Sequence, residues 1–363
     1  MFGSMKKKPC PNCNIPLKPA AYGMMAPGPD NDKYFQMGCL MDENQAVAGC
    51  NQCGYLVYQD GSVDNPFRFR QIYMMLGLAV GDALGAPYEF HPPVSQETPI
   101  VMEHNGWPAG RWTDDTDMAI GILQAWSEVG NITSIEALDR LVEIWNDWAK
   151  TAPDVGIQTR TVLSRMHEVN AINAFAESEA LHEETGRTAG NGSLMRIAPL
   201  ALMAEPDEVI AETVVTVTKL THWDDDNSIA CLIWVFAIRA ALRTGQPDFF
   251  AGFKFLSEKD QERWYGYIQE ANIKEPHEFP NNGWVVAAFQ AAASAVLHNP
   301  FDFKSGIEAA VRAGYDTDTV AAIAGSLLGP IAGWSIPQEW IDNLNGWPGL
   351  DAKGLEELTL KVL

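Results

Sequence analysis

Two short stretches of the chain combine closely spaced carboxylates with threonines, and each precedes an apolar run. The first is "WTDDTDMAI" at residues 112–120, and the second is "YDTDTVAAIAG" at residues 315–325. Asp and Thr are frequent helix N-caps, so two capped helices are the simpler interpretation. A cap needs one such residue, whereas each stretch contains at least four. Carboxylate and hydroxyl oxygens without nearby His or Cys are typical ligands of Mg²⁺ or Mn²⁺, so the stretches also favour a metal site.

Three further stretches carry polar residues next to glycines or helix starts. "GLAVGDALGAPYEF" at residues 77–90 spaces three glycines four apart, with Asp82 inside the apolar run and Glu89 just beyond it. "GNGSLMRIAP" at residues 190–199 is a glycine-rich turn into a helix, which offers backbone N–H groups to an anion or a ribose. It lacks the Lys-Ser/Thr of a P-loop, which argues against an ordinary NTPase. "THWDDDN" puts His222 beside an acidic helix start, a pattern that alone predicts a cap more than a site.

The order of these motifs is more specific than any one of them. G-D-A-L-G-x-P-x-E, W-T-D-D-T, G-N-G-S-x-M-R-x-A-P, T-H and D-T-D-T-x-A-x-I-A-G follow one another in a pattern that resembles the ADP-ribosylglycohydrolase family, over about residues 70–335. The resemblance implies an all-α fold with two Mg²⁺ or Mn²⁺ ions between the two Asp/Thr clusters. The positions that match the family's metal ligands are Thr113, Asp114, Asp115, Asp316, Asp318 and Thr319.

The same resemblance implies roles in catalysis and substrate binding. Glu89 matches a gating or catalytic glutamate of some family branches. The other candidates for the carboxylate that moves a proton are Asp114, Asp115 and Asp316. The loop that would hold ADP-ribose matches Gly190, Asn191, Gly192, Ser193 and Met195. His222 matches a residue near the diphosphate and the distal ribose.

Four polar residues of these motifs have a less specific expectation. Arg196 belongs to a motif, where it would act in the site or brace a carboxylate. Asp117 falls where the family pattern does not demand an acid, and Thr116 and Thr317 are equally unassigned. We predict that these last three residues are helix caps.

The implied reaction is hydrolysis of a glycosidic bond at the ribose carbon C1″. Such a reaction passes through an oxocarbenium-like transition state, with protonation of the leaving group and attack by water from the other face. Two cations would hold the ribose hydroxyls and lower the pKa of a water, while one aspartate would act as general acid or base. ADP-ribosylated protein is the expected substrate and arginine the expected acceptor. Serine-linked ADP-ribose, O-acetyl-ADP-ribose and ADP-ribosylated nucleic acid stay open as alternatives.

Two other functions are compatible with the same motifs. An antagonist of an ADP-ribosyltransferase toxin would block the toxin through the N-terminal extension and also reverse its modification. A catalytically idle member would use the fold alone, although the complete Asp/Thr set argues against this.

The N-terminal extension is defined by its cysteines. Five of the six cysteines lie within the first 53 residues, whereas Cys231 lies in an apolar run where a small core side chain is expected. "CPNC" and "CNQCG" are two C-x-x-C pairs, the spacing of a structural Zn²⁺ site, and they resemble a zinc ribbon. The predicted zinc ligands are Cys10, Cys13, Cys50 and Cys53, with Cys39 as a substitute. Disulfides and free thiols are the competing interpretations, and a cytoplasmic chain disfavours disulfides.

The turn-rich segment "QDGSVDNPFRF" predicts a boundary near residue 66. Residues 1–66 would form a small β-containing, Cys-rich module. Over residues 67–363 the apolar residues recur at intervals of three and four, as they do on α-helices, and Gly245 is a candidate helix end. We therefore predict an all-α fold for the large domain.

The charge of the chain limits its partners. It carries 25 basic and 47 acidic residues, a formal net charge of -22, and only five Lys and six acidic residues lie before residue 67. An acidic surface of this kind repels nucleic-acid backbones and anionic membranes, so neither is an expected partner. No uninterrupted apolar run approaches the roughly 20 residues of a spanning helix, and the N-terminus does not resemble a signal peptide. We therefore expect a cytoplasmic protein.

Overall fold

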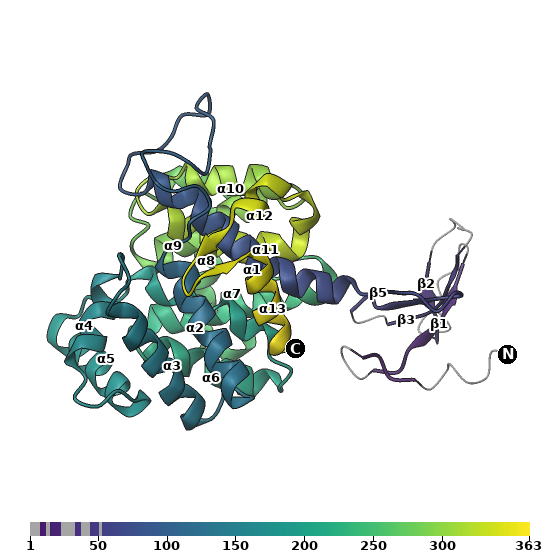
Figure 1. Ribbon diagram of the computed structural model, residues 1–363, viewed down its shortest axis with the longest axis horizontal. Helices are drawn as coiled ribbons and strands as arrows, with labels where there is room; N and C mark the ends of the chain where they lie inside the picture. Colours follow the sequence, from purple (N-terminus) through teal and green to yellow (C-terminus); the bar gives the residue numbers. More distant parts are fainter. Residues whose placement is uncertain (1–7, 12–14, 23–32, 38–43, 51–52) are drawn as a thin grey trace.

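The computed structural model of the chain describes residues 8–11, 15–22, 33–37, 44–50 and 53–363. Short strands come first in the chain, and helices follow from residue 66 onward (Figure 1). Among the described residues, the sequence prediction of an all-α large domain preceded by a small β-containing module is confirmed. The predicted zinc ligand Cys13 and its substitute Cys39 lie outside the described residues.

The N-terminal module is a sheet of five short strands in the order β2-β1-β3-β4-β5. β1 and β2 run parallel, and the other neighbouring strands run antiparallel. The strands are β1 (Lys18–Ala21), β2 (Phe35–Gln36), β3 (Ala46–Gly49), β4 (Leu56–Tyr58) and β5 (Val63–Asp64). Their described buried apolar residues are few: Cys10, Leu17, Ala48, Cys50 and Cys53 form one small cluster.

The large domain is built from thirteen α-helices within the described residues. They are α1 (Pro66–Gly85), α2 (Asp114–Val129), α3 (Ile135–Ala149), α4 (Ile157–Arg165), α5 (Ala171–Thr185), α6 (Asp207–Lys219), α7 (Asp225–Thr244), α8 (Glu258–Ile273), α9 (Val285–His298), α10 (Phe303–Val311), α11 (Thr317–Ala332), α12 (Gln338–Asn343) and α13 (Ala352–Lys361). A two-stranded hairpin, β6 (Asn345–Gly346) and β7 (Leu350–Asp351), precedes α13. Gly245 ends α7 in the left-handed conformation, as predicted.

Helices α1 and α11 pack directly against each other at the centre of the domain. The glycines of α1 make this possible: a Cβ at Gly77 would collide with the backbone of α11, and so would a Cβ at Gly81 or Gly85. At Gly85 the atoms in the way belong to Thr317 and Asp318, in the first turn of α11. The close approach therefore brings the end of α1 to the start of α11, where the second acidic stretch lies.

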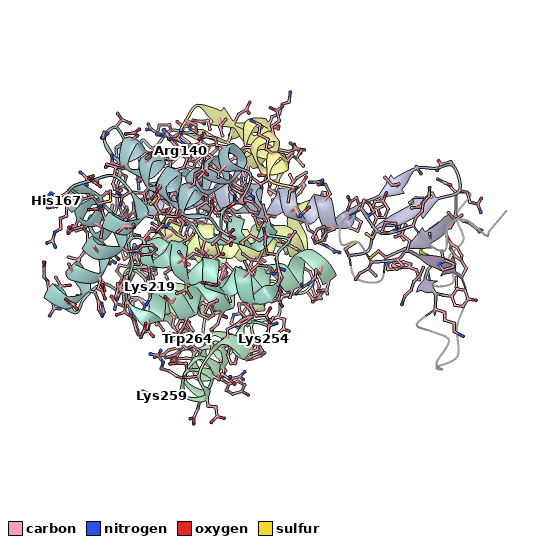
Figure 2. All side chains as sticks on the ribbon, turned by 90° about the horizontal axis from the view of Figure 1, so that it is seen from below. Arg140, His167, Lys219, Lys254, Lys259 and Trp264 are labelled. Carbon is pink, nitrogen blue, oxygen red and sulfur yellow. The ribbon has the colours of Figure 1, made fainter. Side chains whose placement is uncertain are left out.

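Helix α7 belongs to the core of the large domain. By length and apolar composition it is the one described helix that could cross a membrane, but 83% of its most apolar window is buried inside the protein. A helix buried to this extent is a core helix of the domain. The strand module lies to one side of the helical body in both Figure 1 and the view of Figure 2, which is turned by 90°. Phe67, at the start of α1, packs against both hydrophobic clusters.

Candidate active site

The two acidic stretches meet in space, although about 200 residues separate them in the chain. Helices α2 and α11 both begin at the end of α1, so their first turns lie side by side. Two groups of carboxylates result, each with ligand oxygens within 4.8 Å of one another. The inner group consists of Asp82, Asp115 and Asp318, and the outer group of Glu89, Asp316 and Asp318. Asp318 belongs to both groups and joins them into one cluster.

Asp82 is the member of the cluster for which the sequence analysis predicted no role. Its carboxylate accepts four hydrogen bonds: from the backbone N and Oγ1 of Thr113, both at 2.9 Å, and from the backbone N and Oγ1 of Thr116, at 3.0 and 2.5 Å. Asp82 thus caps the N-terminus of α2 from the neighbouring helix α1, where a carboxylate also interacts favourably with the helix dipole. The available signal was a buried charge between two packing glycines, Gly81 and Gly85.

Threonine hydroxyls surround the inner carboxylates. Oγ1 of Thr113 lies 3.1 Å from Oδ2 of Asp115 and 3.4 Å from Oδ2 of Asp318. Oγ1 of Thr319 lies 3.4 Å from the same oxygen of Asp115. The other carboxylate oxygen of Asp115, Oδ1, is buried without a hydrogen-bond partner among the described residues. A buried carboxylate oxygen without a donor is costly, which indicates that a further ligand completes this site.

Three predicted site residues lie at the mouth of the cluster. Glu89, Asp114 and Asp316 are each partly exposed, whereas Asp82, Asp115 and Asp318 are buried. Asp114 belongs to neither carboxylate group, and its Oδ2 accepts a hydrogen bond from the backbone N of Gly156 at 3.1 Å. The mouth therefore offers carboxylates that solvent or a substrate can reach.

The backbone is strained next to two of these residues. Phe90 follows Glu89 and has φ of 63°, and Tyr315 precedes Asp316 and has φ of 65°. Bulky side chains rarely adopt this left-handed conformation, and such strain is found mostly at functional sites. The two strained residues are tied together, since the backbone N of Phe90 donates to the carbonyl oxygen of Tyr315 at 2.6 Å. This link fixes the position of Glu89 relative to Asp316.

The cluster concentrates negative charge without a protein cation to balance it. Burial raises the pKa of Asp82 to about 6, and burial together with Asp154 raises that of Asp114 to about 7. Burial and the charge of Asp316 raise the pKa of Glu89 to about 9. Burial also raises the pKa values of Asp115, Asp316 and Asp318. Among the described residues, no Lys, Arg or His forms an ion pair with these carboxylates.

This arrangement fits a hard divalent cation. The donors are carboxylate and hydroxyl oxygens only, the inner ones are buried, and one of them is unpartnered. Buried charges of this kind must be neutralised by protons or by a cation, and oxygen-only sites select Mg²⁺, Mn²⁺ or Ca²⁺. The cluster can therefore hold metal, as both acidic stretches predicted.

The glycine-rich loop lies beside the outer carboxylates. Its Asn191 donates from Nδ2 to Oδ2 of Asp316 at 2.8 Å, so the loop is joined directly to the cluster. Asn282 braces the same aspartate from the other side, because its Oδ1 accepts from the backbone N of Asp316 at 3.2 Å. The sequence analysis did not identify Asn282, which lies in an unremarkable loop before α9. Ser193 is fully buried and its hydroxyl accepts from Asn227, so it supports the loop from behind.

The predicted loop residues and His222 lie together. A Cβ at Gly192 would lie 3.0 Å from Nε2 of His222, and one at Gly190 would lie 3.7 Å from the same atom. The contact at Gly192 is tight, so glycine at this position lets the imidazole approach the loop closely, whereas the contact at Gly190 is an ordinary one. Met195 is buried below it, with its sulfur 3.9 Å from Oγ1 of Thr319. The structure thus brings Gly190, Asn191, Gly192, Ser193, Met195 and His222 around one loop next to the acidic cluster.

A buried hydrogen-bond chain sets the protonation of His222. Arg196 donates from Nη2 to Oγ1 of Thr221 at 2.6 Å, and this oxygen lies 2.8 Å from Nδ1 of His222. Arginine can only donate, so Oγ1 of Thr221 accepts from it, and the hydroxyl hydrogen of Thr221 is available to Nδ1 of His222. We propose that Nδ1 accepts this hydrogen, which places the proton of the neutral ring on Nε2, the atom that faces the glycine loop. Burial and then the charge of Arg196 lower the pKa of His222 well below its usual value, which keeps the ring neutral.

Arg196 itself differs from the expected carboxylate brace. Its guanidinium is fully buried, lies 4.2 Å from the centroid of the Trp145 ring, and donates to Oγ1 of Thr221 and to the sulfur of Met118. Burial lowers its pKa to about 9. The cation is held by an aromatic face rather than by a carboxylate, and it supports the His222 chain from within the core.

The prediction of three helix caps is wrong. Oγ1 of Thr116 donates to Asp82, and Oγ1 of Thr317 donates to the carbonyl oxygen of Gly85 at 2.8 Å. Both hydroxyls thus tie helices together. Asp117 accepts from Nε1 of Trp112 at 2.9 Å and from Nε1 of Trp148 at 2.8 Å. Its partners lie 5 and 31 residues away in the chain, so local spacing gave no indication of this role.

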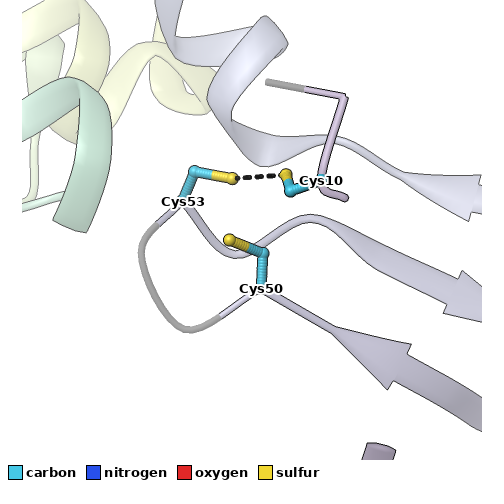
Figure 3. Close-up of side chains that lie close together, drawn as sticks. All are labelled: Cys10, Cys50 and Cys53. Carbon is cyan, nitrogen blue, oxygen red and sulfur yellow. Dashed lines mark hydrogen bonds between the residues drawn. The ribbon is translucent and has the colours of Figure 1, made fainter. Parts of the chain in front are cut away.

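The thiols of the strand module converge as well (Figure 3). Sγ of Cys10, Cys50 and Cys53 lie within 4.8 Å of one another, and all three side chains are buried. Sγ of Cys10 lies 3.5 Å from Sγ of Cys53, much longer than the roughly 2.05 Å of a disulfide bond. Three buried sulfur donors in this arrangement fit a soft or borderline cation such as Zn²⁺.

The fold and the acidic cluster define an all-α protein whose buried oxygen donors, beside a glycine-rich loop, can hold a divalent cation. A family model described as ADP-ribosylglycohydrolase matches residues 65–363, and the chain therefore belongs to this family. Its members are hydrolases that act on glycosyl bonds. The resemblance inferred from the ordered motifs is confirmed, while the individual site residues stay predictions.

Several known proteins are similar to this chain. It is 28% identical over 288 residues to "ADP-ribosylarginine hydrolase Tri1" of Pseudomonas putida, covering 74% of this chain and 72% of that protein. It is 29% identical over 291 residues to "ADP-ribosyl-[dinitrogen reductase] glycohydrolase" of Rhodospirillum rubrum, covering 76% and 90%. A solved structure titled "ADP-ribosylglycohydrolase-related protein complex" has a TM-score of 0.58 and 25% sequence identity, and the match covers 82% of this chain and 97% of that one.

Proposed function

We propose that this chain is a metal-dependent hydrolase that removes ADP-ribose from ADP-ribosylated protein, with arginine as the acceptor. The observation that carries the proposal is the junction of three distant segments, which places Asp82, Asp115 and Asp318 in one buried group with an unpartnered carboxylate oxygen. The names of the two relatives above, an ADP-ribosylarginine hydrolase and an ADP-ribosyl-[dinitrogen reductase] glycohydrolase, support the substrate class.

Two Mg²⁺ or Mn²⁺ ions are the proposed cofactors. The two carboxylate groups that share Asp318 support two ion positions, with hydroxyl oxygens from Thr113 and Thr319 as further donors. When bound, such ions supply Lewis-acid charge next to the ribose hydroxyls and the reacting water.

The residues at the mouth are placed for proton transfer. Glu89 lies at the mouth of the cluster, and in the ion-free site burial and Asp316 raise its pKa to about 9. Its position makes it the candidate general acid, which donates a proton to the nitrogen that leaves the ribose. Asp114, whose pKa burial and Asp154 raise to about 7, is the candidate for the carboxylate that accepts a proton from water. His222 would donate from Nε2 to an oxygen of the bound ADP-ribose.

The test is release of free ADP-ribose from an arginine-ADP-ribosylated protein. The chain is treated with EDTA, dialysed, and assayed alone, with Mg²⁺ and with Mn²⁺. We expect no release by the ion-free protein and full release after ion addition. A serine-ADP-ribosylated protein serves as the matched substrate and should react at least about tenfold more slowly. Release of ADP-ribose that is unaffected by EDTA would contradict the proposed metal dependence. A preference for the serine-linked substrate would contradict arginine as the acceptor.

A second candidate adds inhibition by binding to this activity. The family match begins at residue 65, and the strand module lies to one side of the helical body (Figure 1). A module in this position could contact an ADP-ribosyltransferase toxin without covering the site. Deletion of residues 1–66 should then leave hydrolysis of a small substrate unchanged and abolish capture of the transferase. Equal loss on small and protein substrates would instead make the module a part of the catalytic domain.

Zinc is the proposed structural ion of the strand module. Cys10, Cys50 and Cys53 are the described ligands, and Cys13 is the predicted fourth ligand. Elemental analysis of protein purified without chelator should find one zinc per chain. Cys10→Ser should lose it, whereas Cys231→Ser, which alters a buried cysteine of α7, should retain it. Protein without zinc, or a Cys10→Ser variant that keeps it, would overturn this assignment.

A further inference from the structure

A cleft of about 800 Å³ opens next to the acidic cluster. Its walls come from the loop before α2, the segment that follows α3, and the β6–β7 hairpin near the C-terminus. Thr113 and Asp114 line this cleft, and Thr113 also contacts the inner carboxylates. The cleft is therefore continuous with the mouth of the site. It is distinct from the glycine loop, none of whose residues line it.

Four tryptophans form the apolar part of the cleft. Trp112 and Trp148 are almost completely buried, and both indoles donate to the carboxylate of Asp117, which holds the two rings in place. Trp107 and Trp347 are partly exposed at the rim. The fixed inner rings and the accessible outer rings together form an aromatic surface that solvent reaches.

The charged residues of the cleft are predominantly acidic. Asp114, Asp117, Asp154 and Asp351 line it, and Arg111 is the one basic residue among its lining residues. The guanidinium carbon of Arg111 lies 5.9 Å from the centroid of the Trp107 ring, so this wall already carries a cation on an aromatic face. Aromatic faces next to carboxylates select cations, and guanidinium groups in particular stack on indole rings.

The two halves of the substrate have opposite preferences for this cleft. The diphosphate of ADP-ribose is anionic and would be repelled by the acidic side chains that line the cleft. The glycine loop has no acid of its own and faces Nε2 of His222, which suits the anionic half. The acceptor half must therefore leave the mouth on a different side, and the acidic cleft begins at Asp114 on that side.

We infer that the tryptophan-lined cleft binds the acceptor half of the substrate, as a peptide segment that carries a positively charged side chain close to the ADP-ribosylated residue. This inference rests on the proposed hydrolysis of ADP-ribosylated protein and adds a preference for the sequence around the modified residue. Peptides with flanking Arg or Lys are selected, and those with flanking Glu are disfavoured.

The experiment compares three substrates: free ADP-ribosyl-arginine, an ADP-ribosylated peptide with a flanking Arg, and the same peptide with a flanking Glu. For the wild-type chain, kcat/KM should be about tenfold higher for the Arg peptide than for the Glu peptide. Asp351→Asn should remove most of this preference by raising KM for the Arg peptide. The fold is retained in this variant, because the amide oxygen can still accept from the backbone N of Gly354, as Asp351 does.

Trp347→Leu is a second variant: it keeps an apolar side chain at this position and removes the aromatic ring. It should raise KM for the Arg peptide about tenfold and leave free ADP-ribosyl-arginine within twofold. Trp334→Leu is the matched control, since Trp334 is 70% exposed and lies outside the cleft. The inference would be overturned if kcat/KM were equal for the Arg and Glu peptides. It would also be overturned if the variants lost as much kcat/KM on free ADP-ribosyl-arginine as on the Arg peptide.

The failure of this inference is distinguishable from the failure of the proposed function. Release of ADP-ribose from the free amino acid substrate tests the hydrolase alone, because that substrate has no peptide. Calorimetric binding of the unmodified Arg peptide tests the cleft alone, because it needs no turnover. Binding that weakens about tenfold in Asp351→Asn and is unchanged in Trp334→Leu supports the cleft, and absence of binding to the wild-type chain refutes it.

Discussion

The acidic cluster and the cysteine cluster both come from short, paired sequence motifs, but different parts of the structure hold them in place. In both, short ligand pairs that are distant in the chain converge on one point. The acidic ligands stand on helices whose positions are set by a large apolar core and by the glycine contacts of α1 with α11. In the strand module, three of the five residues of the buried cluster are the cysteines themselves. We therefore expect the small sheet, with so little apolar core, to depend on a bound metal for folding, and the helical domain to fold without one.

The largest expected effect concerns the ligand shared by both carboxylate groups. Asp318→Ala should lower hydrolysis by about a thousandfold or more, because it removes a donor to both ion positions. Its circular dichroism spectrum should stay close to that of the wild type, since the helices do not require the ion. Asp225→Ala is the control, because Asp225 is 89% exposed and its effect should be small. A collapse of helical structure in Asp318→Ala would contradict the contrast between the two clusters.

Zinc removal tests the other half of the comparison. A zinc chelator should unfold the strand module and leave the helical domain intact, because the module has little apolar core without its metal. All twelve tryptophans lie beyond residue 66, so tryptophan fluorescence reports on the helical domain only. We expect unchanged fluorescence together with rapid proteolytic cleavage within residues 1–66. Resistance of the zinc-free module to proteolysis would show that the sheet folds without metal.

The sequence predicted the class of fold and the place of both clusters but not the full set of partners. Helical periodicity and the ordered motifs indicated the all-α domain, and the paired Asp/Thr stretches indicated an oxygen-ligand site. Asp82 received no role, because it precedes Thr113 by 31 residues and its contact depends on how α1 packs. The partners of Asp117 are likewise set by tertiary packing. Residues that act through neighbours distant in the chain leave no periodic or spacing signal.

The stability of the ion-free helical domain should fall as the pH rises. The pKa of Asp82 is raised to about 6 by burial, that of Asp114 to about 7 and that of Glu89 to about 9, all above the roughly 4 expected in the unfolded chain. Between these values the folded state binds more protons than the unfolded state, so unfolding becomes easier as the pH increases.

Calorimetry measures this prediction directly. In EDTA the melting temperature should fall by about 5 °C between pH 5 and pH 9, and Mg²⁺ should raise it more at pH 9 than at pH 5. Asp318→Ala should show a smaller Mg²⁺ effect at both pH values. A melting temperature in EDTA that rises over this interval would mean that the cluster is not forced to hold protons, and the predicted burial of charge would be wrong.

The smallest expected effect concerns the hydroxyl between Arg196 and His222. Thr221→Val leaves Nη2 of Arg196 and Nδ1 of His222 without their shared partner, so the proton of the ring is no longer directed to Nε2. KM for an ADP-ribosylated substrate should rise about tenfold while kcat changes less, because His222 acts on binding. Thr221→Ser keeps the hydroxyl and should restore the wild-type KM. The ¹⁵N NMR chemical shifts of the His222 ring separate this role from a simple loss of packing. In the wild-type chain and in Thr221→Ser the ring should carry its proton on Nε2. In Thr221→Val it should show a mixture of the two tautomers. An unchanged tautomer in Thr221→Val would show that the ring is oriented by other contacts, and the hydrogen-bond chain would then serve only to satisfy the buried arginine.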